Sequence, residues 1–530
     1  MRARRPLRRP TARRSLGRRA ALAATIAVAA LILSGCTFFP GATGSTQTAT
    51  THTDETVPSN LKRFYDQSLT WKKLSGGIDS TYVTVPLSWD DPTGATIKIA
   101  VARHSAGSGK IGSLLINPGG PGGSGFDFVD QAVNYIVTPA VLKKYDIIGF
   151  DPRGVGRSEP AITCYTDPKQ EDQLLYGTYP DAYGTQAWID DLTVVEKNWA
   201  AACLKNTGPL LGHIDAESNA RDMDVIRAVL GDKTMHYLGY SYGTYLGTMY
   251  AELFPKKVGR MVLDGPIDPL VGQLDSLATQ MAGFDSALKS YMAYCLAQKG
   301  CPFTGTVDEG LQQVRAVLDG IDARHLMGSD GRAVDSATVG TGISYTLYSE
   351  DSWPDLTTMF QDLAKGDADS TLENADGYND RSANGTYDNE TDVYAAVTCA
   401  ESDIGHDGVT PLEGLTKIDK AAPILGKYFA YDDYAVLDTA CSNWPEPVAK
   451  LPTTFDAVGA APIMVVATTN DPATPYAGGV SLSKQLSSGV LVTHKGEGHT
   501  VYAQGDSCVD TTVDDYLING TVPQSDPMCD

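Results

Sequence analysis

The chain of 530 residues lacks several features that would assign it to other protein classes. Its N-terminal apolar run, residues 20–33, is too short to span a membrane comfortably. No C-x-x-C pair occurs, and no histidine lies at ligand spacing from a cysteine, which argues against a zinc site. The acidic stretch at residues 367–392 lacks the spacing of a calcium-binding loop. We therefore expect neither a metal nor an organic cofactor.

Positive charge is scarce outside the N-terminus. The sequence has 42 Lys and Arg residues against 64 Asp and Glu residues, a formal net charge of −22. Nine of the arginines lie between Arg2 and Arg19, so the rest of the chain is more acidic still. A surface this acidic argues against nucleic acid and anionic lipid as partners.

Residues 1–35 are typical of an export signal, because a basic region without acidic residues precedes the apolar run. Leu33-Ser34-Gly35-Cys36 resembles a bacterial lipobox, in which Cys36 is lipidated; the alternative is an ordinary signal peptide with an incidental cysteine. Residues 36–58 are rich in Thr, Ser and Gly and predict a flexible tether. We expect an exported protein, either secreted or anchored through Cys36 to the outer face of the bacterial cell membrane. Arg13-Arg14 resembles a twin-arginine signal, and the general and twin-arginine export routes both remain open.

The eight other cysteines are an even number in an exported chain, which indicates disulfides. Many pairings of eight cysteines are possible, so the sequence leaves the connectivity open. Local spacing favours four pairs: Cys164–Cys203, Cys295–Cys301, Cys399–Cys441 and Cys508–Cys529.

Apolar strand-like runs alternate with helix-like stretches over residues 59–267 and 456–530. This alternation predicts a mostly parallel sheet with helices on both faces, with loops that gather at the carboxyl ends of the strands. Over residues 268–455 the alternation stops, and helix-like segments and the polar stretch at 367–392 take its place. We expect this part to be a largely helical cap inserted after the sixth strand.

Gly239-Tyr240-Ser241-Tyr242-Gly243 stands between an apolar run and a helix-like stretch. Strand, G-x-S-x-G and helix in this order are the context of a nucleophile elbow, in which a sharp turn presents the serine hydroxyl above the sheet. The motif predicts an α/β-hydrolase fold with Ser241 as nucleophile.

A serine nucleophile needs an imidazole base and a carboxylate, which follow it in that fold in the order acid, then histidine. His499, in a glycine-flanked loop after the last strand, is the expected base, with His494 as the alternative. Asp471 ends the preceding strand and is the expected acid, with Asp264 as the alternative. We expect the Thr474 hydroxyl to support Asp471 through an Asx-type turn.

An oxyanion hole requires two preorganised donors. The N–H of Tyr242, directly after the nucleophile, is one expected donor, and Gly120 in the glycine-rich loop 117–125 is the other. This loop lacks the Lys-Ser/Thr pair of a nucleotide-binding P-loop, and its prolines remove N–H donors, so we discount phosphate binding.

Together these motifs resemble a known family. Pro118-Gly119-Gly120-Pro121-Gly122 resembles the H-G-G-P-G loop of proline iminopeptidases. The strings at residues 117–125, 151–158, 239–243 and 471–475, with Gly498-His499, are similar to those of actinobacterial tripeptidyl aminopeptidases. The resemblance implies an exported α/β-hydrolase that removes short peptides, often tripeptides, from free N-termini. Pro118 replaces the histidine of proline iminopeptidases and favours the tripeptidyl branch.

An exopeptidase of this kind must bind the substrate ammonium, and a carboxylate in the cap would do so. Glu401 is the candidate that we favour, with Asp403 second. The expected partners are peptides or proteins with a free N-terminus. A carboxylesterase or lipase would use the same three residues, and a peptide-binding lipoprotein without activity is the third alternative.

Overall fold

The computed structural model describes residues 46–49, 51–179 and 181–530. The expected export signal, Cys36 and the first part of the expected tether lie outside the described residues. In the described part of the chain, no helix combines the length and the apolar character needed to cross a membrane.

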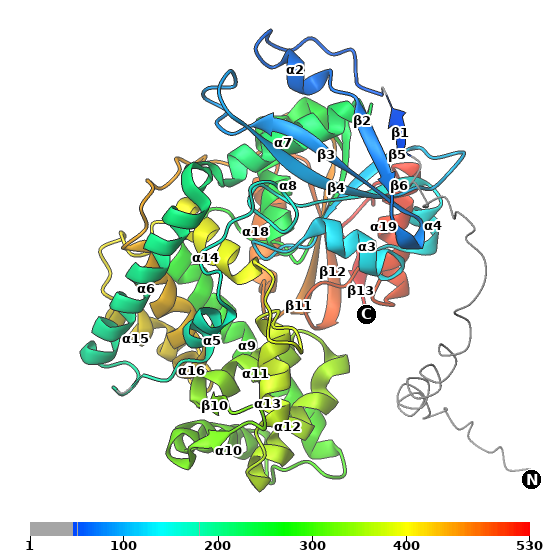
Figure 1. The fold of residues 1–530 in the computed structure, drawn as a ribbon. Helices are drawn as coiled ribbons and strands as arrows, with labels where there is room; N and C mark the ends of the chain where they lie inside the picture. The colour runs from blue at the N-terminus through cyan, green and yellow to red at the C-terminus, as the bar shows by residue number, and fades with distance from the viewer. Residues whose placement is uncertain (1–45, 50, 180) are drawn as a thin grey trace, which may run out of the picture. The chain divides into compact units, whose positions relative to one another are not determined.

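An eleven-stranded sheet forms the centre of residues 46–530, in the order β1-β2-β3-β4-β6-β5-β7-β8-β11-β12-β13 (Figure 1). Pairing is antiparallel from β1 through β4 to β6 and parallel from β6 to β13. The expectation of a mostly parallel sheet is confirmed. The strands are β1 (Thr46–Ala49), β2 (Leu69–Lys73), β3 (Ile78–Pro86), β4 (Thr96–His104), β5 (Gly112–Asn117), β6 (Tyr145–Phe150), β7 (Met235–Tyr240), β8 (Val258–Asp264), β11 (Ile463–Asn470), β12 (Gly489–Glu497) and β13 (Met528–Cys529).

Helices cover both faces of this sheet, because successive side chains of a buried strand point to opposite faces. Leu114 of β5 belongs to a buried apolar cluster with Val129 and Val513, whereas its neighbour Leu115 belongs to a second cluster that contains Ile226. The first cluster includes α3 (Gly125–Ile136) and α19 (Ser507–Asn519); the second includes α7 (Ala216–Val229), α8 (Tyr242–Leu253) and α18 (Tyr476–Gln485).

Between β8 and β11 the described chain is mainly helical, with one small two-stranded sheet. The expectation of an acidic loop at residues 367–392 is wrong for about half of its length, which is helical. Leu372 and Ala375 are buried on one side of a helix, and a second helix begins at Glu390. The elements are α9 (Gln273–Ala297), α10 (Val307–Ile321), β9 (Leu326–Met327), β10 (Ala333–Val334), α11 (Ser336–Leu347), α12 (Trp353–Lys365), α13 (Asp369–Tyr378), α14 (Glu390–Glu401), α15 (Pro411–Ala421), α16 (Gly426–Ala430) and α17 (Val436–Cys441).

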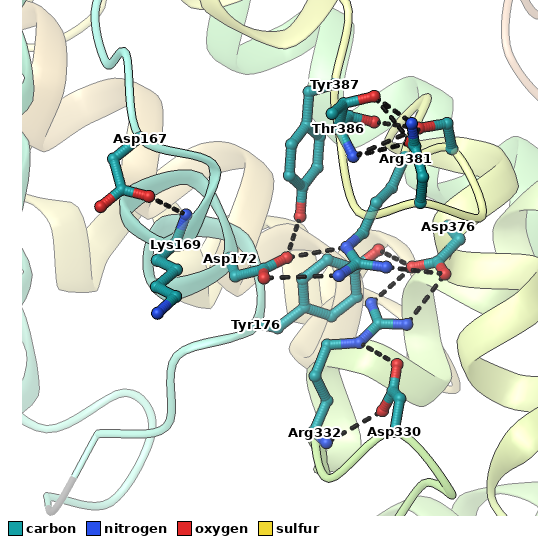
Figure 2. Close-up of polar contacts among 12 residues, drawn as sticks. Asp167, Lys169, Asp172, Tyr176, Asp330, Arg332, Asp376, Arg381, Thr386 and Tyr387 are labelled. Atoms are coloured by element: carbon teal, nitrogen blue, oxygen red, sulfur yellow. Dashed lines mark hydrogen bonds and ion pairs between the residues drawn. The ribbon is translucent and has the colours of Figure 1, made fainter.

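Two helices between β6 and β7, α5 (Pro168–Tyr176) and α6 (Gln186–Thr207), pack with this helical insertion. Figure 2 shows how α5 is held. The Arg332 guanidinium donates to both oxygens of Asp376, which also accepts from the Tyr176 hydroxyl, and Arg381 donates to Asp172. Ion pairs therefore join α5 to the segment between β10 and α14.

The described fold begins closer to the N-terminus than expected, at Thr46. β1 pairs with β2, the Thr53 N–H donates to Ala228, and the Glu55 carboxylate lies 2.6 Å from the buried Arg227 and 3.3 Å from Lys257. The expectation of a flexible tether up to residue 58 is wrong for the described part of that segment. The Glu55 carboxylate holds the segment on the fold by pairing with Arg227 and Lys257, and composition alone does not reveal such a pair.

All four disulfides that the spacing favoured are present in the structure: Cys164–Cys203, Cys295–Cys301, Cys399–Cys441 and Cys508–Cys529.

Candidate active site

Ser241 occupies a strained turn between β7 and α8. Its φ of 53° and ψ of −125° are rare for a residue with a side chain, and such strain is frequent at functional sites. The turn needs both flanking glycines. A Cβ atom on Gly239 would lie 2.3 Å from the Gly243 carbonyl oxygen, and one on Gly243 would lie 2.7 Å from the Asn117 carbonyl oxygen. The sequence motif thus forms the sharp elbow that it predicts.

Backbone donors surround the Ser241 side chain. Tyr242 is the first residue of α8, so its N–H has no acceptor within the helix. A Cβ on Gly119 would lie 2.8 Å from Ser241 Cβ and 3.0 Å from the Tyr242 nitrogen, which places the glycine-rich loop against the elbow. The Gly119 N–H donates to the Asn117 side chain, so it is not free for an oxyanion, and Gly120 remains the expected donor of this loop.

His499 and Asp471 form a hydrogen-bonded pair. His499 Nδ1 lies 3.0 Å from Asp471 Oδ1 and 2.9 Å from Oδ2. The Asp471 carboxylate also accepts the N–H groups of Ala473 and Thr474, both at 2.9 Å, and the Thr474 hydroxyl at 3.0 Å. These donors hold the buried carboxylate in place and orient the imidazole, which is the role of the acid in a catalytic triad.

The rest of the His499 ring is enclosed by the cap. The Tyr348 ring packs edge-on against the imidazole, with 5.4 Å between the ring centres. The backbone carbonyl of Tyr348 also accepts the backbone N–H of His499. Burial opposes the imidazolium, but the charge and hydrogen bond of Asp471 and the charge of Asp264 outweigh it, so the His499 pKa is raised. The same carboxylate thus favours the imidazolium that a general base forms when it takes a proton.

Among the described residues, no hydrogen bond joins Ser241 to His499. The buried Nε2 atom of His499 has no hydrogen-bond partner among them. The two residues nevertheless contact consecutive residues of β8 and the loop after it. The Ser241 N–H donates to the Asp264 carbonyl, and a Cβ on Gly265 would lie 2.9 Å from His499 Cε1. Catalytic hydrogen bonds are often long before substrate binds.

The two alternatives from the sequence have other partners. His494 Nδ1 lies 2.8 Å from Asp506 Oδ2, away from Asp471. Asp264 is fully buried, but its Oδ2 accepts the N–H groups of Val501 and Tyr502, at 3.0 and 2.8 Å, and not the His499 ring. Geometry therefore favours Asp471 and His499.

A cavity of about 1080 Å³ opens onto Ser241 and lies between the sheet edge and the helical insertion. Gly120, Tyr242 and Thr474 line it, and the exposed apolar side chains of Leu270 and Val271 contribute to its wall. The volume exceeds what a single amino acid requires and is in the range of ligand sites.

Glu401 and Asp403 both line this cavity. Glu401 Oε2 accepts the Tyr242 hydroxyl at 2.8 Å, and Oε1 accepts the Ala216 N–H. Burial first, and then the charge of Asp215, raise the pKa of Glu401 to about 8. Asp403 is exposed. The structure thus places Glu401 beside the elbow, with a hydrogen bond to the residue after the nucleophile.

Sequence reasoning missed Glu390, the first residue of α14. A Cβ on Gly120 would lie 3.2 Å from Glu390 Oε1, so this carboxyl group adjoins the expected oxyanion donor. Burial, together with Asp380 and Asp388, raises the pKa of Glu390 well above its usual range. A neutral carboxyl group is compatible with an oxyanion nearby, whereas a charged one would oppose it. No sequence motif marks Glu390, because it reaches the loop from a distant helix.

Comparisons with known proteins indicate the family of the chain. The family model described as "TAP-like protein" matches residues 427–529. The chain is 34% identical to "Serine protease Hip1" of Mycobacterium tuberculosis over 96% of both chains. It is 36% identical to "Carboxylesterase B" of the same species, over 84% of this chain and 85% of that protein. It is 30% identical to "Tripeptidyl aminopeptidase" of Streptomyces lividans, over 85% of this chain and 83% of that protein.

These two matches cover 96% and 83% of the respective relatives. The chain therefore belongs to the tripeptidyl aminopeptidase-like family of serine hydrolases with the α/β-hydrolase fold.

Proposed function

We propose that the protein is an exported serine exopeptidase that releases short peptides, and specifically tripeptides, from free N-termini. The observation that carries this proposal is the Asp471–His499 pair near the Ser241 elbow, together with the cavity that Ser241 and Glu401 both line. The relatives named serine protease and tripeptidyl aminopeptidase support the peptide substrate.

In the proposed reaction, His499 Nε2 takes the Ser241 proton while Oγ attacks the scissile carbonyl carbon. The resulting oxyanion accepts the N–H groups of Gly120 and Tyr242. Asp471 stabilises the imidazolium, which then gives its proton to the leaving amine as the C–N bond breaks. Water, deprotonated by His499, hydrolyses the acyl-enzyme; it releases the peptide acid and restores the Ser241 hydroxyl.

Glu401 is the proposed acceptor for the substrate ammonium, with Asp403 as the second candidate. A bound cation would favour the ionised form of Glu401, whose pKa lies near 8 in the empty cavity. The Tyr242 hydroxyl would then fix the orientation of the carboxylate.

Chromogenic tripeptides with free and with acetylated N-termini test this proposal. We expect release of tripeptide from the free substrate only, together with labelling by a fluorophosphonate probe that Ser241→Ala abolishes. Equal rates on both substrates would refute recognition of the substrate ammonium. Labelling that persists in Ser241→Ala would refute Ser241 as the nucleophile. Glu401→Gln should lower kcat/KM for the free peptide by about tenfold or more, because a charge-assisted hydrogen bond is lost.

A carboxylesterase is the second candidate. The exposed apolar Leu270 and Val271 at the cavity and the relative named "Carboxylesterase B" favour it. Acyl esters of increasing chain length distinguish the two activities: a kcat/KM on esters that exceeds that on every free tripeptide would support the esterase.

We also propose that lipid at Cys36 anchors the exported protein to the outer face of the cell membrane. The four disulfides support export, and the lipobox-like sequence supports the anchor. Metabolic labelling with an alkyne fatty acid should mark the wild-type protein and not Cys36→Ala; equal labelling of both would refute the anchor.

A further inference from the structure

Glu196 of α6 is a buried acid without a partner in the wall of the cavity. Its side chain is 1% exposed, it lines the cavity, and its Oε1 has no hydrogen-bond donor. Buried polar atoms are nearly always hydrogen-bonded, and an unpaired carboxylate inside a protein is costly. Glu196 therefore calls for a donor that the described residues do not supply.

Two more buried acids lie close to Glu196: Glu171 of α5 and Asp392 of α14. The Asp392 oxygens accept from Trp199 Nε1 at 2.8 Å and from the Cys164 N–H at 2.9 Å, so Asp392 is held as an acceptor. Burial, and then the charges of Asp392 and Glu171, raise the pKa of Glu196 to about 8. A cation at this place would interact with all three groups.

The two arginines that contact α5 form ion pairs with other acids. Figure 2 shows Arg332 with Asp330 and Asp376, and Arg381 with Asp172. Across the described ranges, no ion pair joins a lysine or arginine to Glu171, Glu196 or Asp392. The same network fixes α5, so the wall next to Glu196 is held in place by the cap.

The surroundings suit an organic cation better than a metal ion. The carboxylate oxygens of Glu171, Glu196 and Asp392 are not among the described groups whose ligand atoms converge within 4.8 Å. Apolar and aromatic side chains of α5 and α6 line the same cavity as Glu196; we name Leu174, Leu175, Tyr176, Glu196 and Trp199 the α5–α6 wall. Such a wall takes up an alkyl chain, and its rings and carboxylate attract the charge at the end.

We propose that the α5–α6 wall is a binding site for an alkylammonium or guanidinium group of the substrate, with Glu196 as the carboxylate that accepts its hydrogen bonds. This inference rests on the proposed function, because a peptide substrate brings the cation. Two sources share the chemistry: a Lys or Arg side chain and the N-terminal ammonium itself. The site is separate from Glu401, whose oxygens already accept from Tyr242 and Ala216.

The test compares fluorogenic tripeptides on the full exported chain and on Glu196→Gln. One series places lysine or norleucine at each of the three positions in turn, and the other places a free or acetylated N-terminus on the norleucine peptides. If a side chain is bound, the wild type prefers lysine over norleucine at one position by about tenfold or more, and Glu196→Gln abolishes that preference. If the N-terminus is bound, Glu196→Gln abolishes the preference for the free amine instead.

If Glu196→Gln keeps both the preference for lysine over norleucine and the preference for a free N-terminus, the proposed site is refuted. Asp190→Asn, an exposed acid on the same helix, is the matched control and should leave both preferences as in the wild type. Fluorophosphonate labelling shows whether each variant is folded with a reactive Ser241. A labelled wild type that releases no peptide would instead refute the proposed function.

If Glu196→Gln is not labelled, competitive inhibition of the wild-type enzyme by amino-acid amides tests the site instead. Lysine amide, norleucine amide and N-acetylnorleucine amide differ in one cationic group at a time. We expect the side-chain or the N-terminal cation to strengthen inhibition by about tenfold. Equal inhibition by all three would overturn the site.

Discussion

Asp264 contacts both halves of the catalytic machinery. Its backbone carbonyl accepts the Ser241 N–H, and its carboxylate accepts the N–H groups that follow His499 at Val501 and Tyr502. Burial raises the Asp264 pKa to about 6 despite these donors, and its charge in turn raises the pKa of His499. We interpret Asp264 as a positioning residue that holds the Ser241 turn and the loop after His499 in fixed positions relative to each other.

The first prediction concerns Asp264→Asn. The amide keeps an oxygen for the two backbone N–H groups but removes a negative charge near His499, so the His499 pKa falls. Because His499 acts as a base only when neutral, the acid limb of the kcat/KM profile should move to lower pH, by about one unit at most. A pH profile on a neutral ester measures this shift. Asp308→Asn, an exposed acid of α10, is the control, and an unmoved acid limb in Asp264→Asn would contradict the account.

The second prediction concerns Glu390. Below its raised pKa this carboxyl group is neutral, and as pH rises through that pKa its charge opposes the oxyanion at Gly120. Wild-type kcat on a neutral ester should therefore fall at alkaline pH, and Glu390→Gln should keep the activity and lose the fall. An identical alkaline limb in both proteins would show that Glu390 does not face the oxyanion.

The residues that could be predicted from the sequence are those whose roles are local. Ser241, Asp471 and His499 each follow a strand end, and Thr474 reaches Asp471 within a single turn. Glu196, Glu390 and Tyr348 could not be predicted, because each depends on the packing of a helix against an element far away in the chain. Nothing in their neighbouring residues distinguishes them from other acids and tyrosines.

At the scale of elements, side chains join α5 to the helical insertion: Asp172 pairs with Arg381, and the Tyr176 hydroxyl donates to Asp376. Its residue Tyr176 and the Arg332 guanidinium meet at Asp376, and the guanidinium also lies 4.6 Å from the Tyr176 ring. The sequence does not indicate that α5 and α6 line the cavity, because both precede the elbow and lie outside residues 268–455, which were expected to form the cap. Their role follows from tertiary contacts alone.

The third prediction is that Arg332→Gln loosens α5. Arg332 is largely buried with Asp376, so its loss should lower the free energy of unfolding by about 2 kcal/mol and raise KM for tripeptides. Urea unfolding and steady-state kinetics measure the two effects. Lys62→Gln removes an exposed surface pair and should change stability by less than about 0.5 kcal/mol. Equal effects of the two substitutions would contradict a special role of this network.

At the scale of the whole molecule, residues between Thr46 and Pro58 already belong to the described fold, which was expected to begin at residue 59. Composition predicted a tether because Thr, Ser and Gly dominate the segment. The structure instead adds β1 to the sheet and uses Glu55 to pair with Arg227 and Lys257, contacts that no composition argument could supply.

The fourth prediction follows from these contacts. A chain that begins at residue 60 should be less stable than one that begins at Thr46, by about 2 kcal/mol or more, because the buried Arg227 loses a charged partner. Glu55→Gln in the longer chain should reproduce part of the loss. Urea unfolding of the three proteins tests this, and equal stabilities would show that residues 46–59 contribute nothing to the fold.

The central claim is that Ser241, Asp471 and His499 act together in an exopeptidase with a cavity for a short peptide. Mass analysis of a peptide library digested by the purified protein tests it most directly. The account predicts tripeptides released from free N-termini, no products from acetylated peptides, and no products with Ser241→Ala. Internal cleavage of acetylated peptides, or the same products from Ser241→Ala, would contradict it.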